Sequence, residues 1–204
     1  MAWTDYVRPG AFEAKINSFV PAVKAARASA GHPAVVVFPE DIGLFLVAAG
    51  AERALERCKT TGEAFNRLAL RYAPAIAWAM VRRRVTNPKA AFWLARAGHV
   101  HEIMIRAFSR FARETGAHVV AGSAALPRNA HGLVIRPFAP AGREVFNLSY
   151  TFGPTGEVLA ETAKVNLVPT MEDTIGLSPG SAARVPAVDA GGFVPVPRPP
   201  SWHG

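Results

Sequence analysis

The sequence predicts an α/β fold, and three observations lead to this prediction. A helical pattern over residues 11–30 precedes a short run of β-branched residues at 34–38. A second helix and a second apolar strand follow in the same order at 101–115 and 117–123. From residue 133 onward the pattern becomes that of strands. Helices that alternate with apolar strands are typical of a sheet with helices packed on it.

The first predicted helix and strand occupy residues 11–38. Gly31 suits the end of the helix, and apolar residues recur before it at helical spacing, at Phe12, Ile16, Phe19, Val20 and Val23. The run Ala34–Phe38 is apolar and rich in valine, and Pro39 ends it. We expect this run to be a buried strand in a sheet that is covered on both faces.

Residues 50–115 are predicted to be helical because alanine and arginine dominate and strand patterns are absent. Pro74 and Pro88 are expected to break the helical run, since proline lacks a backbone donor. The clearest helix spans about 101–115 and is followed by Gly116. Arginines lie on its other faces, and its apolar face carries Met104, Phe108 and Phe111.

Strands dominate the pattern after this helix. The predicted strands are 117–123, 133–138, 145–152 and 157–164. Gly153-Pro-Thr-Gly156 separates the last two and consists of turn-forming residues, so these strands are expected to form a hairpin. From about residue 178 the strand pattern is lost, and residues 190–204 form a proline-rich tail that we expect to be disordered.

Length and composition favour one domain with a substantial core. The chain has 204 residues, of which 50% are hydrophobic and 19% are charged. The net charge is +8, and residues 53–113 alone hold 13 Lys and Arg against three Glu, a balance of +10. Of the 23 basic residues, 18 are Arg, a bias that a GC-rich coding sequence also produces. A basic nucleic-acid-binding module is therefore the least favoured interpretation, and no nucleic-acid partner is expected.

The sequence predicts a cytoplasmic protein without a membrane partner. The longest apolar runs, 34–50 and 68–81, are shorter than a membrane span and are interrupted by charged residues or proline. The first residues lack the basic and apolar regions of a secretion signal. The single cysteine, Cys58, excludes a disulfide framework and a multi-cysteine zinc site.

Two charged residues stand at predicted strand ends. Glu40 follows the first strand, at the end where α/β sheets present their functional sites, although a helix N-cap or a solvated loop acid would fit the same position. Lys164 ends the hairpin strand and could stabilise a developing oxyanion as a point charge. An ordinary edge-strand lysine is the simpler interpretation of Lys164 taken alone.

A third candidate is the acidic pair Glu172–Asp173, which precedes the turn-like segment Gly176–Gly180. A carboxylate in such a place is often only a turn residue. Near a lysine and another carboxylate, however, it could orient a base or hold an amine. No metal site is expected, because His99 and His101 are two residues apart and point to different sides of a helix.

The order of these motifs resembles the nitrilase superfamily of carbon–nitrogen hydrolases. The apolar strand that ends in Phe-Pro-Glu is the first element of the resemblance. More specific are the series Asn-x-Ser-Tyr-x-Phe from Asn147, the Gly-x-x-Gly turn, Lys-x-x-Leu-x-Pro from Lys164 and Leu-x-Pro-Gly from Leu177. The resemblance covers about residues 11–189, with one departure at 50–100.

The resemblance implies an incomplete α-β-β-α sandwich of the nitrilase type. Residues 1–189 would be a partial carbon–nitrogen hydrolase domain, with 50–100 as a basic helical insert. Enzymes of this family use a cysteine nucleophile, a glutamate base and a lysine that stabilises the tetrahedral intermediate.

By position in the motifs, Glu40 matches the base and Lys164 the lysine. Glu172 is the best match to a second glutamate, and Asp173 is the alternative. The substrates implied are nitriles, amides, carbamoyl compounds or acyl donors, without a cofactor, and family members usually form homo-oligomers.

The cysteine nucleophile is the main departure from the family pattern. The family places it on a strand after the Leu-x-Pro-Gly turn, where this sequence continues into the proline-rich tail. Cys58 lies on a predicted helix of the insert, far from that position, and is interpreted as an ordinary thiol. The family's opening strand has no counterpart in residues 1–10.

We therefore expect a hydrolase-like chain that is truncated or frameshifted before its nucleophile and is inactive alone. A frameshift or an early stop would produce the abrupt change in composition at Asp189. A non-catalytic interaction protein that reuses the half-fold is the alternative.

Overall fold

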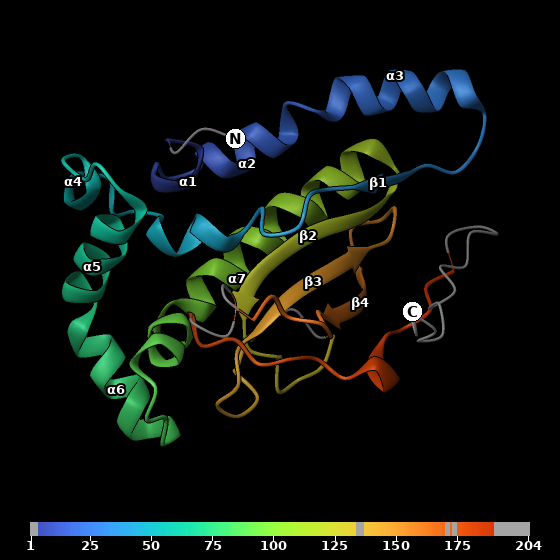
Figure 1. The fold of residues 1–204 in the computed structure, drawn as a ribbon. Helices are drawn as coiled ribbons and strands as arrows, with labels where there is room; N and C mark the ends of the chain where they lie inside the picture. The colour runs from blue at the N-terminus through green and yellow to red at the C-terminus, as the bar shows by residue number, and fades with distance from the viewer. Residues whose placement is uncertain (1–3, 134–136, 170–171, 173–174, 190–204) are drawn as a thin grey trace.

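One long helix, α7 (Pro88–Thr115), packs against one face of a four-stranded sheet. The computed structural model describes residues 4–133, 137–169, 172 and 175–189 (Figure 1). The helices before α7 are α1 (Thr4–Val7), α2 (Ala11–Asn17), α3 (Val20–Ala30), α4 (Glu52–Leu55), α5 (Thr61–Arg71) and α6 (Ala73–Arg83). Short 3-10 helices lie at Leu44–Ala48 and Ala182–Arg184. The predicted mixed α/β class is confirmed.

The strands follow the order β1-β2-β3-β4 across the sheet. Their bounds are β1 (Val35–Val37), β2 (His118–Leu126), β3 (Phe146–Phe152) and β4 (Val158–Ala163). β1 and β2 are parallel, whereas β2 pairs with β3, and β3 with β4, in antiparallel fashion. β1, β2 and β4 therefore run in one direction, and β2 and β4 end beside the first residues of β3. β1 ends earlier along the sheet, with Val37 opposite Val120. We call the end of the sheet toward which these three strands run its carboxyl end.

The predicted hairpin is confirmed. β3 and β4 match the predicted strands 145–152 and 157–164 to within one residue at each end. Two bonds of 2.9 Å close the turn between them, from Gly153 N–H to Glu157 O and from Gly156 N–H to Gly153 O. Gly156 has φ 84°, in the left-handed region that glycine enters without strain.

The core lies between α7 and the sheet. Met104, Phe108 and Phe111 of α7 have no exposed surface, as predicted for the apolar face of this helix. The ring centroid of Phe108 lies 5.0 Å from that of Phe38 and 6.0 Å from that of Phe12, both in edge-to-face contact. α7 is longer than the predicted helix at 101–115 because it begins already at Pro88.

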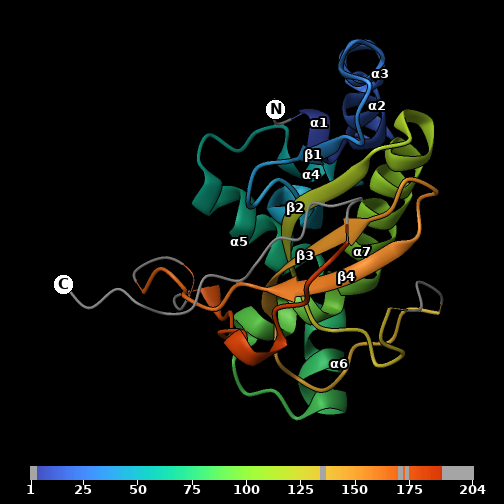
Figure 2. The same ribbon diagram turned by 90° about the vertical axis from the view of Figure 1, so that its right-hand side faces the viewer.

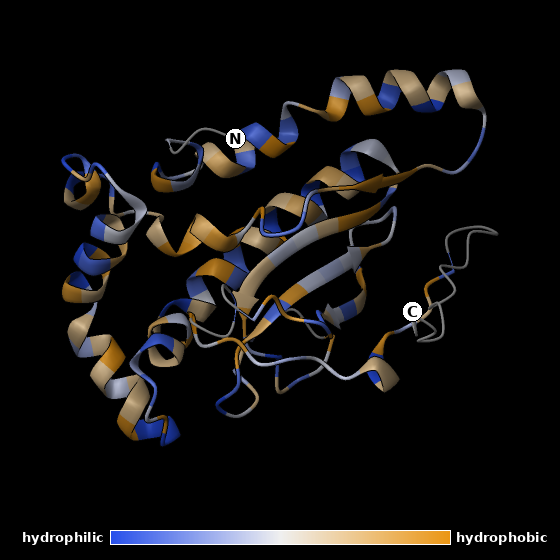
Figure 3. Cartoon of the chain, in the orientation of Figure 1, coloured by the Kyte–Doolittle hydropathy of each residue, from blue (hydrophilic) through white to orange (hydrophobic). Residues whose placement is uncertain are grey.

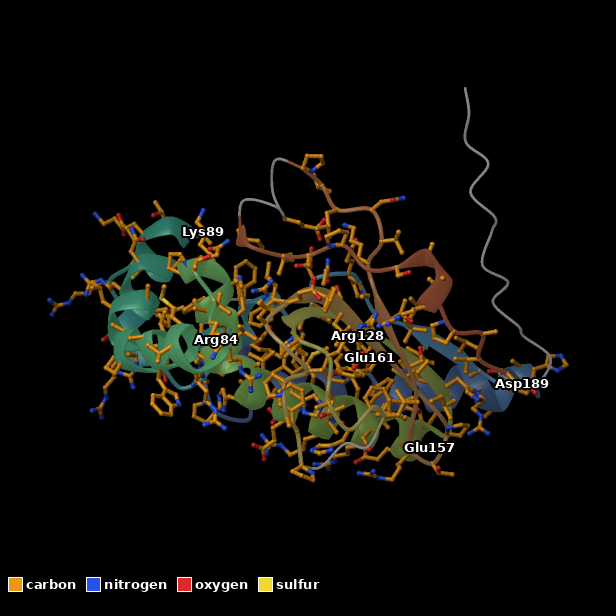
Figure 4. All side chains as sticks on the ribbon, turned by 90° about the horizontal axis from the view of Figure 1, so that it is seen from below. Arg84, Lys89, Arg128, Glu157, Glu161 and Asp189 are labelled. Atoms are coloured by element: carbon orange, nitrogen blue, oxygen red, sulfur yellow. The ribbon has the colours of Figure 1, made fainter. Side chains whose placement is uncertain are left out.

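A partly buried ion pair joins the end of β2 to β4. Arg128 Nη1 lies 2.7 Å from Glu161 Oε1, and the two residues are labelled next to each other in Figure 4. The Arg128 guanidinium also lies over the Phe146 ring, 5.3 Å from its centroid. Burial raises the pKa of Glu161, and the hydrogen bond from Arg128 opposes that rise. The pair therefore stabilises the loop that follows β2 against the outer strand.

The predicted helix over 11–30 is two helices, α2 and α3, so this prediction is wrong at its centre. The chain tightens at Ser18 and Phe19, whose N–H groups donate to carbonyls three residues back. Pro21 lies in the first turn of α3 and offers no N–H to the carbonyl four residues earlier. A continuous helix would leave that carbonyl unpaired. Gly31 ends α3 with φ 66°, as predicted.

β1 is an edge strand, and the prediction of a strand buried on both faces is wrong. Val36 packs toward the core, whereas Val35 and Val37 are 43% and 69% exposed. Figure 2 shows α7 along one side of the strands. A valine-rich run indicates a strand through its β propensity, but which of its faces is covered depends on layers that come from elsewhere in the chain.

The predicted helical segment 50–115 contains α4, α5, α6 and α7, at the left and behind the sheet in Figure 1. Pro74 and Pro88 each lie in the first turn of a helix, α6 and α7, so both interrupt the run as predicted. α6 packs on α7, and α5 precedes it end to end. We call residues 61–83 the α5–α6 arm.

Two predicted segments fall on residues outside the described ones. They are the middle of the predicted strand at 133–138 and the proline-rich tail from residue 190 onward. No described helix combines the length and the apolar character that a bilayer crossing requires.

Candidate active site

The carboxyl end of the sheet brings Glu40, Lys164 and Glu172 together. Lys164 Nζ lies 2.9 Å from Glu40 Oε1 and 2.9 Å from Glu172 Oε2. Asn147, near the start of β3, donates from Nδ2 to Glu40 Oε1 at 3.0 Å and to Glu172 Oε1 at 2.7 Å. We call these four residues the strand-end cluster. Segments distant in the sequence carry them, and the order of the strands places them side by side.

A bulge in β2 holds the turn that carries Glu40. Gly122 has φ 68°, and a Cβ at this residue would lie 2.1 Å from Pro39 O, so the two backbones approach at a distance that glycine permits. Ser123 Oγ accepts a hydrogen bond of 2.9 Å from Asp41 N–H. Glu40 therefore projects from a turn that is held on both sides, and its side chain is 52% exposed.

Lys164 is held by backbone hydrogen bonds on both sides. Its N–H donates to Asn147 O at 2.9 Å, and its carbonyl accepts from Gly180 N–H at 2.8 Å. A Cβ on Gly180 would lie 2.6 Å from Ala163 O, so the predicted turn at Leu177–Gly180 passes very close to the end of β4. Although β4 is an edge strand, the Lys164 ammonium points to the two carboxylates.

Glu172 is the buried carboxylate of the cluster. Val168 N–H donates to Glu172 Oε2 at 2.7 Å. Burial acts to raise the pKa of Glu172, but the bonds from Val168 N–H, Lys164 and Asn147 together outweigh burial and lower it. The carboxylate therefore keeps its charge inside the fold. Asp173, the alternative candidate, lies outside the described residues.

The charges around Lys164 favour its protonated form. Hydrogen bonds to Glu172 and then to Glu40 raise the pKa of Lys164, against the smaller effect of burial. The pKa of Asp41, the next residue to Glu40, is raised by burial and by the charges of both glutamates, while Lys164 opposes the rise. The cluster is thus a set of carboxylates organised around one ammonium.

The three carboxylates of Glu40, Asp41 and Glu172 are also a donor set of the kind that a divalent cation uses. Their oxygens lie within 4.8 Å of one another. The Lys164 ammonium already lies against two of the three. The geometry therefore balances these negative charges with a lysine.

Asn147 is the member of the cluster that the sequence analysis missed. Its side chain is buried, and its Oδ1 has no hydrogen-bond donor among the described residues. The sequence showed Asn147 only as part of a strand motif between apolar residues. A buried side-chain amide is costly unless it is hydrogen-bonded. An asparagine among the apolar residues at the start of a predicted strand was therefore the signal that could have identified it.

Cys58 and the two histidines lie away from the strand-end cluster. Cys58 is a half-buried thiol that follows α4, which is at the left of Figure 1, whereas the strands are at its centre. The His101 ring stacks on Phe138 with centroids 4.1 Å apart. Burial, and then the charge of Arg96, lower the pKa of His99. Among the described residues, neither histidine belongs to a group of three or more potential metal ligands.

Comparison with solved structures finds carbon–nitrogen hydrolases and amidases. A carbon–nitrogen hydrolase from Helicobacter pylori G27 is 14% identical with a TM-score of 0.41, over 83% of this chain and 40% of that one. The NitN amidase from Nesterenkonia sp. AN1 is 14% identical with a TM-score of 0.43, over 89% and 49%. A variant of the amidase from Nesterenkonia sp. AN1, to whose active-site cysteine acrylamide has added, is 15% identical with a TM-score of 0.42, over 89% and 49%.

This chain spans 40% to 49% of the length of these solved structures. No family model and no curated protein matches it. A further structure similar to the chain is described as an amidase of the nitrilase superfamily, the class of protein that the order of sequence motifs resembles.

Proposed function

We propose that the chain carries the general base and the oxyanion-stabilising group of a carbon–nitrogen hydrolase, acting on nitriles, amides or carbamoyl compounds. One observation carries this proposal: the Lys164 ammonium lies within 2.9 Å of the carboxylates of both Glu40 and Glu172. Acyl transfer to a thiol needs a base that takes the thiol proton and a positive donor beside the developing oxyanion. The cluster offers both in one place.

The two glutamates are suited to different roles. Glu40 is half exposed and can meet a nucleophile, so we assign it the role of base. Glu172 is buried, and its pKa is lowered, which makes it a poor proton acceptor. Its charge instead positions Lys164, with Asn147 setting the orientation of both carboxylates.

Lys164 is assigned the stabilisation of the oxyanion. Its pKa is raised, so it is protonated at neutral pH. An ammonium group has three N–H donors, of which two point to Glu172 and Glu40. We propose that the third donates to the oxyanion of the tetrahedral intermediate.

The nucleophile in this proposal comes from outside the sequence of this chain. Glu40, Lys164 and Glu172 supply a base and charges but form no covalent intermediate. The one cysteine, Cys58, follows α4, and Figure 1 shows α4 apart from the strands. We propose a cysteine on a segment that a truncation or frameshift near residue 189 separates from this chain, and we propose that the chain alone is inactive.

A small nucleophile added from solution tests the proposal without the missing segment. Hydroxylamine and acetamide give a hydroxamate and ammonia, because the nitrogen of hydroxylamine attacks the carbonyl carbon and the amide C–N bond breaks. Without hydroxylamine we expect no ammonia above background. With it we expect hydroxamate formation by the wild-type chain to exceed that by Glu40→Gln and by Lys164→Ala.

Glu114→Gln and Lys24→Ala serve as matched controls, because these side chains lie on helices away from the cluster. Both controls should keep the wild-type rate. Equal hydroxamate formation by the wild type, Glu40→Gln and Lys164→Ala, with unchanged circular dichroism, would overturn the proposal. Ammonia release without hydroxylamine that disappears in Cys58→Ala would place the nucleophile in the helical insert instead.

A further inference from the structure

We propose that the α5–α6 arm docks on the surface of a membrane that contains anionic lipids. The starting observation is a group of large apolar side chains that the arm presents to solvent. Leu70 is 77% exposed, Trp78 63% and Val81 75%. Soluble monomeric proteins rarely expose several large apolar side chains together, and such a patch marks a binding surface.

The patch covers the exposed side of α6 and the end of α5. On α6, Pro74, Ala77 and Val81 recur at spacings of three and four residues, and Trp78 adjoins them. Leu70 lies near the end of α5, two residues before the turn at Tyr72. All five are exposed. The opposite side of α6 packs on α7, so this short helix is apolar on two sides. A helix that covers a core on one side normally presents polar residues on the other.

Arginines flank the patch and provide the charge complementarity. Residues 61–84 contain five Arg and one Glu, a balance of +4. Arg83 turns inward and donates to the carbonyls of Pro140 and Gly142, at 3.0 Å each. Figure 4 shows Arg84 on the helical side of the molecule, away from the Arg128–Glu161 pair. The remaining arginines of this segment are exposed beside the patch, at Arg67, Arg71, Arg82 and Arg84.

An anionic lipid surface matches both features of the arm. Tryptophan favours the boundary between headgroups and acyl chains. Arginine binds anionic headgroups while its apolar stem stays in the interface. Each of α5 and α6 has 11 residues, too few to cross a hydrocarbon layer of about 30 Å, so the arm lies on the surface.

This proposal departs from the expectation of no membrane partner. The expectation rested on the absence of an apolar run long enough to span a bilayer. The exposed side of the arm instead combines short apolar spacing with flanking charge, which is the pattern of a helix that lies in the interface. The hydropathy colouring in Figure 3 shows hydrophobic residues along α6 and hydrophilic residues at its end.

Co-sedimentation with vesicles tests the proposal. We expect the full chain to sediment with vesicles of equal parts phosphatidylcholine and phosphatidylglycerol, more weakly with phosphatidylcholine alone, and less as salt increases. The double variant Trp78→Ser with Val81→Ser, and the double variant Arg71→Gln with Arg82→Gln, should each bind the anionic vesicles roughly tenfold more weakly.

Val35→Ser with Val37→Ser is the matched control, because it removes two exposed valines from β1, away from the arm. It should bind like the wild type. Failure of the wild type to bind anionic vesicles, or equal binding by all variants, would overturn the proposal. So would a dimer in analytical ultracentrifugation that the Trp78→Ser and Val81→Ser substitutions abolish, because the patch would then pair two copies of the chain.

Discussion

The strand-end cluster and the α5–α6 arm depart from ordinary protein surfaces in opposite ways. At the cluster, polar and charged groups are drawn inward, and Asn147 and Glu172 are buried among hydrogen bonds. On the arm, Leu70, Trp78 and Val81 are turned outward. Buried polar groups and exposed apolar groups are the informative exceptions in a fold. The comparison shows that the chain has two regions in which the placement of side chains is not explained by stability alone.

We expect the largest difference in the free energy of unfolding between a variant that truncates an aromatic residue of the core and one that truncates an aromatic residue of the arm. Phe108→Ala removes a ring with no exposed surface that contacts Phe12 and Phe38, and we expect it to lower the free energy of unfolding by about 3–5 kcal/mol. Trp78→Ala should change it by about 0.5 kcal/mol or less. Urea unfolding of the three proteins measures both effects. A large loss in Trp78→Ala would show that the arm needs this side chain to fold.

A second pair compares two glycines. Gly122→Ala places a Cβ 2.1 Å from Pro39 O at a φ of 68°, and we expect a loss of about 2 kcal/mol or more, with displacement of the Glu40 turn. Gly62→Ala, in the first turn of α5, meets only Thr60 Oγ1 at 4.0 Å and should stabilise the chain by up to about 1 kcal/mol. Thermal melts distinguish them. Similar effects at both positions would contradict the close approach at the bulge.

The third prediction concerns how the free energy of unfolding depends on pH through Glu172. Because the pKa of Glu172 is lowered by folding, its contribution to stability is complete above its ordinary pKa of 4.5 and is lost as pH falls through the lowered value. Lys164 has the opposite sign: its raised pKa gives a contribution that is complete below 10.5 and is lost as pH rises above that. Glu172→Gln should cost about 1–3 kcal/mol at neutral pH.

The measurement is urea unfolding at neutral and at strongly acidic pH. The wild type should lose more of its free energy of unfolding on acidification than Glu172→Gln does. A control at a glutamate of α7 outside the cluster, Glu114→Gln, should behave like the wild type. The same acid sensitivity in Glu172→Gln and the wild type would contradict the charged state assigned to this buried carboxylate.

The smallest effect is expected from Cys58→Ala. This thiol is remote from the strand-end cluster, so its loss should leave hydroxamate formation and ammonia release unchanged. A coupled ammonia assay on both proteins provides the measurement. A lower rate of either reaction in Cys58→Ala would show that the helical insert contributes to the reaction, which this proposal does not expect.

Much of the cluster was visible in the sequence, because Glu40, Lys164 and Glu172 each stand beside a strand end or a turn. Their association required the tertiary structure, in which the turn after β1 is held at the bulge of β2 and β4 ends beside the start of β3. Asn147 was not predicted, because a strand motif does not show which of its side chains contact charged residues from other segments.

The two wrong predictions, for the helix at 11–30 and for the burial of β1, also differ in how local their causes are. The break between α2 and α3 was readable in principle, since Pro21 denies a donor to the preceding turn. The exposed face of β1 was not readable, because an apolar run has the same appearance whether one face or two are covered.

Local backbone chemistry was determined by the sequence itself. The turn at 153–156, the helix starts at Pro74 and Pro88 and the left-handed stop at Gly31 depend on residues that are adjacent in the chain. Only the tertiary structure decided that one amide, on Asn147, joins two carboxylates and that the apolar side of the arm faces outward. The physical reason is distance along the chain: burial and pairing between remote segments depend on how strands and helices stack, which no local pattern contains.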